Sequence, residues 1–145
     1  QIYTSTDSGV NWTARDSNRQ WQIITSSFDG AKLAAGVWGE YIYTSTDSGV
    51  NWTARITDGS KSWYSISSSS DGAKLVAVNS DFDYIWFSSD SGTTWTTIEN
   101  QRWWATAGIS GDGSRLVVSE SYSNVYTGLY ISCDTSSESS SSSSA

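Results

Sequence analysis

The side chains with the most potential for chemistry are aspartates that recur at matched positions along the chain. Three occupy a repeated octapeptide, Ser-x-Asp-x-Gly-x-x-Trp, and three precede a glycine in a second motif: Asp7, Asp47, Asp90, Asp29, Asp71 and Asp112. Such carboxylates could bind calcium, but the segments around them lack the dense alternating acids of a calcium loop. An aspartate in a tight turn instead accepts hydrogen bonds from backbone N–H groups just ahead of it. We therefore expect turn-capping carboxylates, with no metal and no cofactor.

Composition removes most of the usual catalytic groups. The 145 residues include no histidine, which is the commonest general base and a frequent metal ligand. Five arginines are present, but Arg15 and Arg55 occupy equivalent repeat positions, and Arg115 takes the place of Lys32 and Lys74. We therefore expect a protein that is not an enzyme.

Aromatic and charged side chains gather in the segments that differ between repeats. Aromatic rings with carboxylates nearby suit sugar rings or a protein partner. The alternative is that Trp38 and Phe82 merely pack against the next repeat. The candidate binding residues are Arg19, Trp38, Glu40, Asp81, Phe82, Asp83, Arg102, Trp103 and Tyr122.

The octapeptide organises the chain, because copies of it recur about every 40 residues, the spacing of a supersecondary repeat. Residues 1–15 repeat residues 41–55 at every position except the first. The aspartate caps the turn, the glycine permits the positive φ that closes it, and the tryptophan carries a large apolar surface into the next strand. The complete copies contain Ser5, Asp7, Gly9 and Trp12, then Ser45, Asp47, Gly49 and Trp52, then Ser88, Asp90, Gly92 and Trp95.

Each repeat contains four short segments with the composition of strands. Strand A runs from Trp21 to Ser27, and an Asp-Gly hairpin turn leads into strand B at residues 32–37. A variable loop precedes strand C around Ile42, and the octapeptide turn leads into strand D at residues 51–55. Four antiparallel strands in about 40 residues make one blade of a β-propeller. The predicted fold is therefore all-β.

The repeats divide residues 1–134 into complete blades at 21–55 and 63–98 and partial blades at 1–15 and 104–134. Closed propellers usually need four or more blades. We therefore expect further blades from a longer parent chain or from a homo-oligomer. Residues 135–145 are almost entirely serine and predict a disordered tail or linker.

Cys133 is the only cysteine, so no internal disulfide can form. It lies in a fourth octapeptide that begins at Ser132 and then lacks the glycine and the tryptophan. We interpret Cys133 as a substitute residue in this degenerate copy, with an intermolecular bridge as the alternative.

The repeats also distinguish two faces of the predicted blades. In an up-and-down blade, the A–B and C–D turns lie on one face, and the B–C and D–A loops lie on the other. The A–B and C–D turns are nearly invariant in this chain, whereas the B–C and D–A segments vary. Because binding residues concentrate in variable loops on a constant scaffold, we expect the B–C and D–A loops to contact the ligand.

The octapeptides at residues 5–12, 45–52 and 88–95 match the Asp-box, or BNR repeat, and the chain resembles the propellers that carry it. These include sialidases, some other glycoside hydrolases, sortilin-type receptors and photosystem assembly factors of the thylakoid lumen. The resemblance covers residues 1–134 and implies a turn that serves as architecture, away from ligands. A sialidase-like site would also need three arginines that clamp a carboxylate, a Tyr–Glu pair and an acidic proton donor. Three of the five arginines belong to the repeat, so no such triad is predicted.

Charge and hydropathy restrict the partners. A formal net charge of −7 with few basic residues argues against a nucleic-acid partner. No apolar run approaches the roughly 20 residues that span a bilayer. We expect an extracellular or otherwise extracytoplasmic protein, with the thylakoid lumen as the alternative. In that setting, the sequons at Asn11 and Asn51 are candidate glycosylation sites.

Together these features predict a non-catalytic binding or scaffolding module that is an extracellular subunit of a larger assembly. Its variable B–C and D–A loops would contact carbohydrate or protein. Two alternatives stay open at this point. One is an accessory or assembly subunit of a photosynthetic membrane complex, and the other is the blade portion of a sialidase-like glycoside hydrolase.

Overall fold

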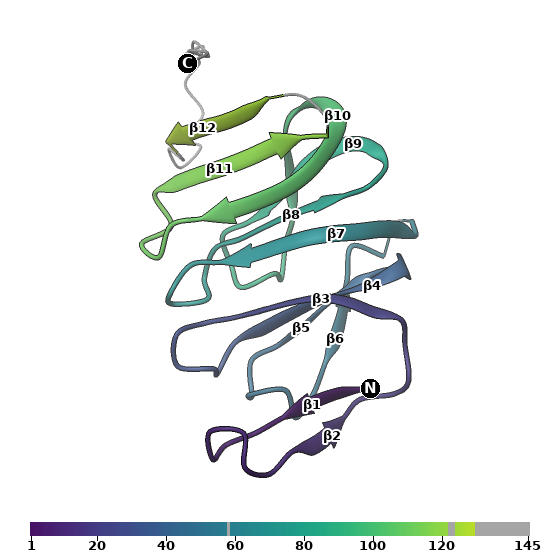
Figure 1. Cartoon of the computed structure of the whole chain (residues 1–145), viewed down its shortest axis with the longest axis vertical. Coiled ribbons are helices and arrows are strands. Elements are labelled where there is room, and N and C mark those ends of the chain that lie inside the picture. Colours follow the sequence, from purple (N-terminus) through teal and green to yellow (C-terminus); the bar gives the residue numbers. More distant parts are fainter. Residues whose placement is uncertain (58, 122–123, 130–145) are drawn as a thin grey trace.

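A computed structural model describes residues 1–57, 59–121 and 124–129, and within them every regular element is a β-strand. The strands form layers that are stacked along the long axis of the molecule (Figure 1). Tyr122, Cys133, the degenerate fourth octapeptide and the serine-rich segment 135–145 lie outside the described residues. The strands are β1 (Ile2–Thr4), β2 (Thr13–Arg15), β3 (Trp21–Ser26), β4 (Leu33–Glu40), β5 (Ile42–Ser45), β6 (Thr53–Arg55), β7 (Lys61–Ser68), β8 (Leu75–Asn79), β9 (Phe82–Ser88), β10 (Thr96–Ile109), β11 (Arg115–Glu120) and β12 (Val125–Leu129).

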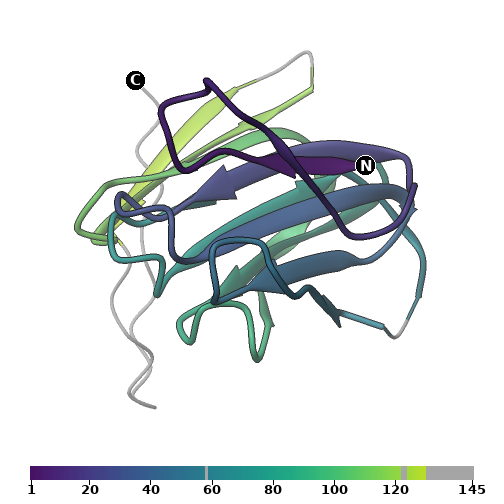
Figure 2. The same ribbon diagram turned by 90° about the horizontal axis from the view of Figure 1, so that it is seen from below.

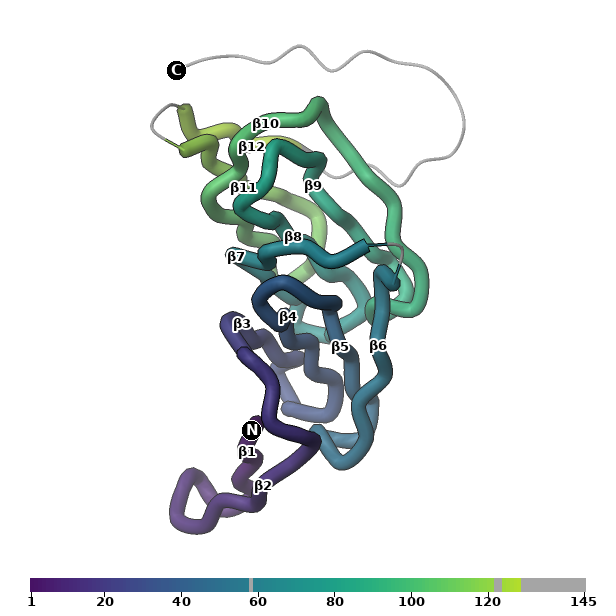
Figure 3. The backbone as a smooth tube through the Cα atoms, turned by 90° about the vertical axis from the view of Figure 1, so that its right-hand side faces the viewer, coloured from purple at the N-terminus to yellow at the C-terminus, as the bar shows by residue number. Residues whose placement is uncertain are grey.

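Most antiparallel pairs join strands within groups of neighbours, and a short pairing of β4 with β7 connects two of these groups. β3, β4, β5 and β6 pair in chain order, and Figure 3 shows them side by side across the stack. β7, β8, β9 and the first part of β10 form the next group. The last part of β10 then pairs with β11, and β11 pairs with β12. The strands β1 and β2 form a sheet of their own. We number these groups blades 1 to 4 in chain order, beginning with β1 and β2.

Strand β10 belongs to two blades. Its residues Thr96–Ile98 pair with β9 as a fourth strand, and its residues 104–109 pair with β11 as a first strand. The sequence predicts a loop over residues 99–103 between these two parts. Arg102 and Trp103 instead pair with the first residues of β9, after a shift of register. The connection between blades 3 and 4 is therefore held as part of a 14-residue strand.

The apolar core is built from side chains of successive blades. Because alternate residues of a strand point to opposite faces of the sheet, each inner blade offers apolar side chains to both of its neighbours. Ile42 of blade 2 is buried together with Trp63 and Ala77 of blade 3. A second cluster joins blades 3 and 4 and contains Val76, Val78, Ile85, Phe87, Trp104, Ala107 and Val118. Burial of apolar surface therefore holds each blade to the next one.

The octapeptide turn of blade 2 is closed by its own side chains. Ser45 donates from its hydroxyl to Asp47 at 2.8 Å and accepts the Gly49 amide at 2.9 Å. Asp47 in turn accepts the amide of Asn51 at 2.9 Å. The Trp52 indole N–H donates to the Gly49 carbonyl at 3.0 Å, and Gly49 has the positive φ, 84°, that the turn requires. The turn therefore holds the carboxylate with its own backbone and side chains, as the sequence predicts for this motif.

The A–B turns connect neighbouring blades on one side of the molecule. The Phe28 amide donates to the Ser70 carbonyl at 2.8 Å, and the Ser70 amide donates to the Gly111 carbonyl at 2.7 Å. The octapeptide glycines also sit at blade contacts, since a Cβ on Gly49 would lie 2.8 Å from the Thr4 methyl carbon. The nearly invariant turns thus serve to join blades.

Both ends of the stack present open surfaces in the described residues. Figure 2 views the molecule from the end at which blade 1 lies. There Trp12 is 62% exposed, whereas its counterparts Trp52 and Trp95 are only partly exposed. At the other end, a groove of about 610 Å³ lies on blade 4. Its lining includes Gly108, Ile109, Leu116, Val117, Thr127 and Gly128.

Candidate ligand-binding face

The B–C and D–A connections lie on one side of the stack, and the A–B turns lie on the other (Figure 1). The first side includes the end of β4, the start of β7, the link between β8 and β9 and the bend within β10. We call this side the loop face. Most of the candidate binding residues belong to these connections, so their side-chain contacts decide what the face can bind.

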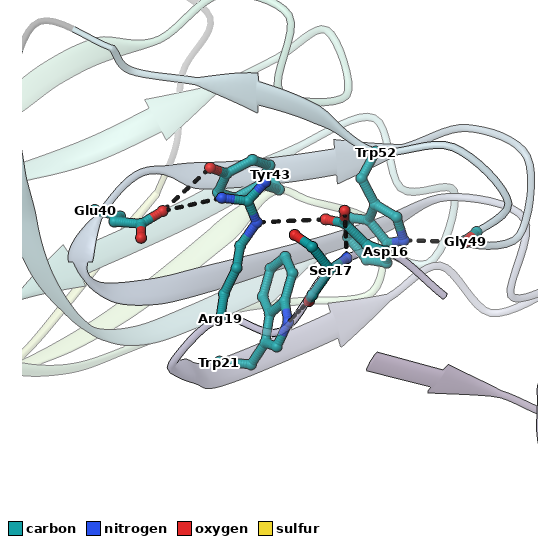
Figure 4. A network of polar contacts seen from close by, with 8 residues as sticks. All are labelled: Asp16, Ser17, Arg19, Trp21, Glu40, Tyr43, Gly49 and Trp52. Carbon is teal, nitrogen blue, oxygen red and sulfur yellow. Dashed lines mark hydrogen bonds and ion pairs between the residues drawn. The ribbon is translucent and has the colours of Figure 1, made fainter. Parts of the chain in front are cut away.

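Arg19, just before β3, lies in a network of polar and aromatic contacts (Figure 4). Its Nη1 atom is 3.3 Å from Glu40 Oε2, and its Nε atom is 3.6 Å from Asp16 Oδ2. The guanidinium carbon lies 4.5 Å from the centre of the Tyr43 ring, and the edge of the Trp21 ring system packs on that same ring at 5.4 Å. Burial is the main cause that raises the pKa of Tyr43, so its hydroxyl stays protonated and donates to Glu40 at 3.3 Å.

The next blade repeats this arrangement with different residue types. Lys61 Nζ lies 3.0 Å from Asp83 Oδ2 and 5.0 Å from the centre of the Trp86 ring. Asp83 also accepts hydrogen bonds from the Asn79 side-chain amide at 2.7 Å and from the Trp86 indole N–H at 3.2 Å. Burial acts to raise the pKa of Asp83, but hydrogen bonds from Asn79, the Tyr84 amide, Lys61 and Trp86 outweigh it and lower the pKa. The carboxylate therefore stays ionised.

Blade 4 contains a third arrangement of the same kind. Arg102 Nη1 lies 3.4 Å from Glu120 Oε2 and donates to the Tyr126 hydroxyl at 2.9 Å. The guanidinium carbon is 5.2 Å from the centre of the Tyr126 ring and 5.8 Å from that of Trp104. Tyr126 also donates to Glu120 at 3.3 Å.

We call these three arrangements the ionic groups; each consists of a base, a carboxylate and an aromatic ring of strand C. The base always lies two residues before the tryptophan that opens strand A, which is Trp21, Trp63 or Trp104. This spacing is visible in the sequence. The sequence interpretation did not use this spacing, and so it missed the contributions of Lys61, Tyr43, Trp86 and Tyr126. Four candidate binding residues, Arg19, Glu40, Asp83 and Arg102, thus have partners inside the protein.

The aromatic candidates are placed differently, because their rings face solvent. Trp38, Phe82 and Trp103 are between 43% and 55% exposed, as is Tyr64, which the sequence analysis did not single out. The rings of Phe82 and Trp103 lie 5.9 Å apart. Trp38 is paired with Ser62 across β4 and β7, which places it on the same face as Tyr64, two residues further along β7. We call Trp38, Tyr64, Phe82 and Trp103 the aromatic band.

The remaining candidates have local partners. Asp81 accepts the Ser62 amide at 3.3 Å, and its own amide donates to the Asn79 side-chain oxygen at 3.0 Å. The amide nitrogens of the two sequon asparagines are also occupied: Asn11 donates to Asp7 at 2.6 Å, and Asn51 donates to Asp47 at 2.7 Å. Glycan transfer to either asparagine would require this hydrogen bond to break.

Two features are absent from the described residues. These residues contain no helix of the length and apolarity that crossing a membrane requires. They also contain no cluster of three or more histidine, cysteine, aspartate or glutamate side chains in an arrangement suited to a metal ion.

Comparison with solved structures identifies the architecture. A GH74 enzyme of Niastella koreensis superposes with a TM-score of 0.65 at 16% identity, over 86% of this chain and 24% of its own. YCF48 bound to D1 peptide gives 0.64 at 15% identity over 79% and 39%. The β-propeller domain of Myceliophteria thermophila Cps50 (Swd1) gives 0.65 at 12% identity over 79% and 37%. The chain has the β-propeller fold.

This likeness confirms the predicted all-β fold of antiparallel propeller blades. The chain spans only 24% to 39% of the length of those three structures, so it corresponds to part of a propeller. At identities of 12% to 16%, the likeness is one of fold. No protein-family model matches the sequence, and no curated protein matches it either.

Proposed function

We propose that this chain is a non-catalytic binding module of Asp-box propeller blades, part of an extracellular assembly, and that its loop face binds a neutral carbohydrate. The observation that carries the proposal is the aromatic band, whose four rings are exposed on the loop face while three nearby bases are paired with carboxylates. The octapeptide turns support the Asp-box assignment, since each carboxylate is held by its own turn.

The pairing of charges favours an uncharged ligand. A base that already contacts a carboxylate and an aromatic ring offers little free charge to an anionic ligand, and the carboxylates offer little to a cationic one. An exposed aromatic ring still presents a flat apolar surface. The axial C–H groups of a sugar ring can pack on such a surface while the sugar hydroxyls stay in water. A neutral glycan is therefore the ligand class that the face suits best.

The state of the carboxylates supports a binding role over a catalytic one. Glycoside hydrolysis usually needs one carboxyl with a raised pKa to protonate the leaving group and a second to act as nucleophile or base. Asp83 is the most deeply placed acid of the ionic groups, with 13% of its side chain exposed. Its pKa is lowered, because its hydrogen bonds outweigh the effect of burial. This direction is opposite to what a proton donor needs.

A glycan-binding assay tests the proposal. The full chain is titrated with neutral hexasaccharides of glucose, mannose and xylose and with a hexamer of galacturonate, and binding is followed by calorimetry. We expect binding to at least one neutral hexamer and weaker binding to the acidic one. Trp103→Ala should weaken binding about fivefold or more, the value of a good aromatic contact. Phe28→Ala is the matched control, because Phe28 is 94% exposed and lies at an A–B turn on the opposite side.

Two results would overturn this proposal. One is binding to none of the hexasaccharides, and the other is an equal loss of affinity for Trp103→Ala and Phe28→Ala. Release of sugar from a fluorogenic glycoside by the full chain would overturn the non-catalytic part alone.

A peptide-binding role is the second candidate, because one structure similar to this chain is YCF48 bound to D1 peptide. A subunit of that kind would belong to an assembly at a membrane complex. Binding of an unstructured peptide library to the loop face, with loss on Trp103→Ala and no binding of any hexasaccharide, would favour this candidate over the first.

Open blade surfaces at both ends support the scaffolding part of the proposal. Trp12 and the groove on blade 4 are surfaces that another blade would cover in a larger propeller. The mass of the native particle, compared with the mass of the polypeptide, tests for such blades in a homo-oligomer. A particle with the mass of one chain would contradict that version.

A further inference from the structure

A pocket opens between blades 3 and 4 beside the aromatic band. It has a volume of about 370 Å³ and is lined by Tyr64, Ser80, Trp104, Ala105 and Ser121. This volume lies within the range of ligand pockets, roughly 300–1,000 Å³. Tyr64 belongs to both the pocket and the aromatic band, so the two are continuous. None of the described lining residues carries a charge.

The repeats explain why the pocket exists at this junction. Trp38 and Ser80 occupy equivalent positions, because the amide of each donates to the carbonyl of the residue just before the tryptophan that opens strand A, Trp21 or Trp63. Tyr64 and Ala105 are also equivalent, because each directly follows the tryptophan that opens strand A of its blade. The junction between blades 2 and 3 thus has Trp38 and Tyr64 where the next junction has Ser80 and Ala105. Two large rings are replaced by two small side chains, and the space they would occupy is the pocket.

The lining suits a partner that both donates and accepts hydrogen bonds. The hydroxyl groups of Tyr64, Ser80 and Ser121 form no hydrogen bond with any described residue. A hydroxyl can act as donor and as acceptor, and so can each hydroxyl of a sugar. The half-exposed ring of Tyr64 provides an apolar wall for the carbon face of the ligand.

We propose that this pocket holds one uncharged pyranose unit of the glycan that lies on the aromatic band. The inference rests on the proposed function, and it adds a defined subsite to it. The ring of that unit packs on Tyr64, and its hydroxyls exchange hydrogen bonds with Ser80 and Ser121. A unit with a carboxylate is disfavoured, because the described lining contains no base to pair with it.

Filling the pocket with the residues of the neighbouring junction tests the inference. Ser80→Trp and Ala105→Tyr each introduce a side chain that the equivalent position of the molecule already accommodates. Each variant is titrated with the neutral hexasaccharide that binds the wild type, and its fold is checked by near-ultraviolet circular dichroism. We expect each variant to lose about tenfold or more in affinity, as one sugar unit is displaced. Gln22→Tyr, the equivalent change at the junction of blades 1 and 2, should leave the affinity unchanged.

Tyr64→Phe covers the case in which a filled variant does not fold. It keeps the ring and removes one hydroxyl, and we expect about a threefold to tenfold loss of affinity from the lost hydrogen bond.

The outcomes separate this inference from the proposed function. Wild-type affinity in folded Ser80→Trp and Ala105→Tyr, together with loss in Trp103→Ala, would overturn the pocket and leave the aromatic band in place. Wild-type affinity in Tyr64→Phe would overturn the inference when the filled variants are unfolded. Failure of the wild type to bind any hexasaccharide would overturn both.

Discussion

Replacement of Lys61 by methionine should destabilise the protein more than the equivalent replacement of Arg19 or Arg102. Lys61 Nζ lies 3.0 Å from Asp83 Oδ2, and the two side chains are only 22% and 13% exposed. Arg19 and Glu40 are 28% and 43% exposed. Solvent screens an ion pair less as its exposure falls, so the pair in blade 3 should contribute most. Methionine keeps an unbranched apolar stem, which limits the change to the loss of the charge.

The expected loss can be worked out from the contacts of the ammonium group. A hydrogen bond to a charged partner contributes about 1.5–3 kcal/mol, and a cation–π contact near the surface contributes about 0.5–1 kcal/mol. Asp83 keeps its hydrogen bonds from Asn79 and Trp86, so the carboxylate is not left without partners. We therefore expect the free energy of unfolding to fall by about 2 kcal/mol, the sum of the lower limits for the hydrogen bond and the cation–π contact. For a domain of this size, the melting temperature would fall by roughly 4–8 °C.

Thermal and urea unfolding of the wild type, Lys61→Met, Asp83→Asn and the double variant would measure this effect. The double-mutant cycle should give a coupling energy of at least about 1 kcal/mol. Arg115→Met is the charge-matched control, because Arg115 is exposed and forms no ion pair with a described residue. A coupling energy of zero, or equal melting-temperature shifts for Lys61→Met and Arg115→Met, would refute the assignment of the ionic groups as stabilising contacts.

Three further predictions concern the turns and the blade contacts. Asp47→Ala should lower the melting temperature. Asn51→Thr should leave it nearly unchanged, because the third octapeptide already has a threonine at this position that donates to its aspartate. Similar shifts in melting temperature for both variants would contradict this role of the Asp47 carboxylate. Hydrogen bonds, first from the Asn51 amide, lower the pKa of Asp47 to about 2. The stabilisation by the ionised Asp47 should therefore be complete above about pH 4 and disappear as the pH falls towards 2. The difference in melting temperature between the wild type and Asp47→Asn should shrink over the same pH range. Gly36→Ala should cost about 1–3 kcal/mol from overpacking, since its Cβ would lie 2.9 Å from Trp63 Cβ. Gly128→Ala is the control, because no atom lies near the position of its Cβ. Equal urea midpoints for the two variants would count against close packing of blades 2 and 3 at Gly36.

The repeated turns could be predicted from the sequence because their contacts are local. In the octapeptide of blade 2, the side-chain hydrogen bonds that close the turn join residues two to four positions apart. Such contacts depend on residue types within one short window, so Asp47 and Gly49 indicate their own roles. The blade fold follows from the same periodicity, because four strand segments and two turn motifs recur about every 40 residues.

The state of the loop face could not be predicted in this way. Arg19 and Glu40 are 21 positions apart, and Lys61 and Asp83 are 22 apart. Their pairing depends on how the start of strand A comes to lie beside the end of strand B, for Glu40, or beside the start of strand C, for Asp83. Sequence reasoning grouped these charges with the exposed aromatics as one binding set, whereas the structure separates paired ions from exposed rings. Tyr64 looked like an ordinary strand residue, because nothing local shows that Ser80 and Ala105 leave space beside it.

The sequence alone determined the all-β class, the blade repeat and the roles of Asp47 and Gly49, since short-range hydrogen bonds and backbone conformation follow from neighbouring residues. Only the tertiary structure decided which charged side chains are free, which rings face solvent and where a pocket opens. Those properties arise between strands and between blades, where distant residues such as Tyr64 and Ala105 come together. Burial and pairing are therefore set by packing across the stack, and a single repeat does not contain that information.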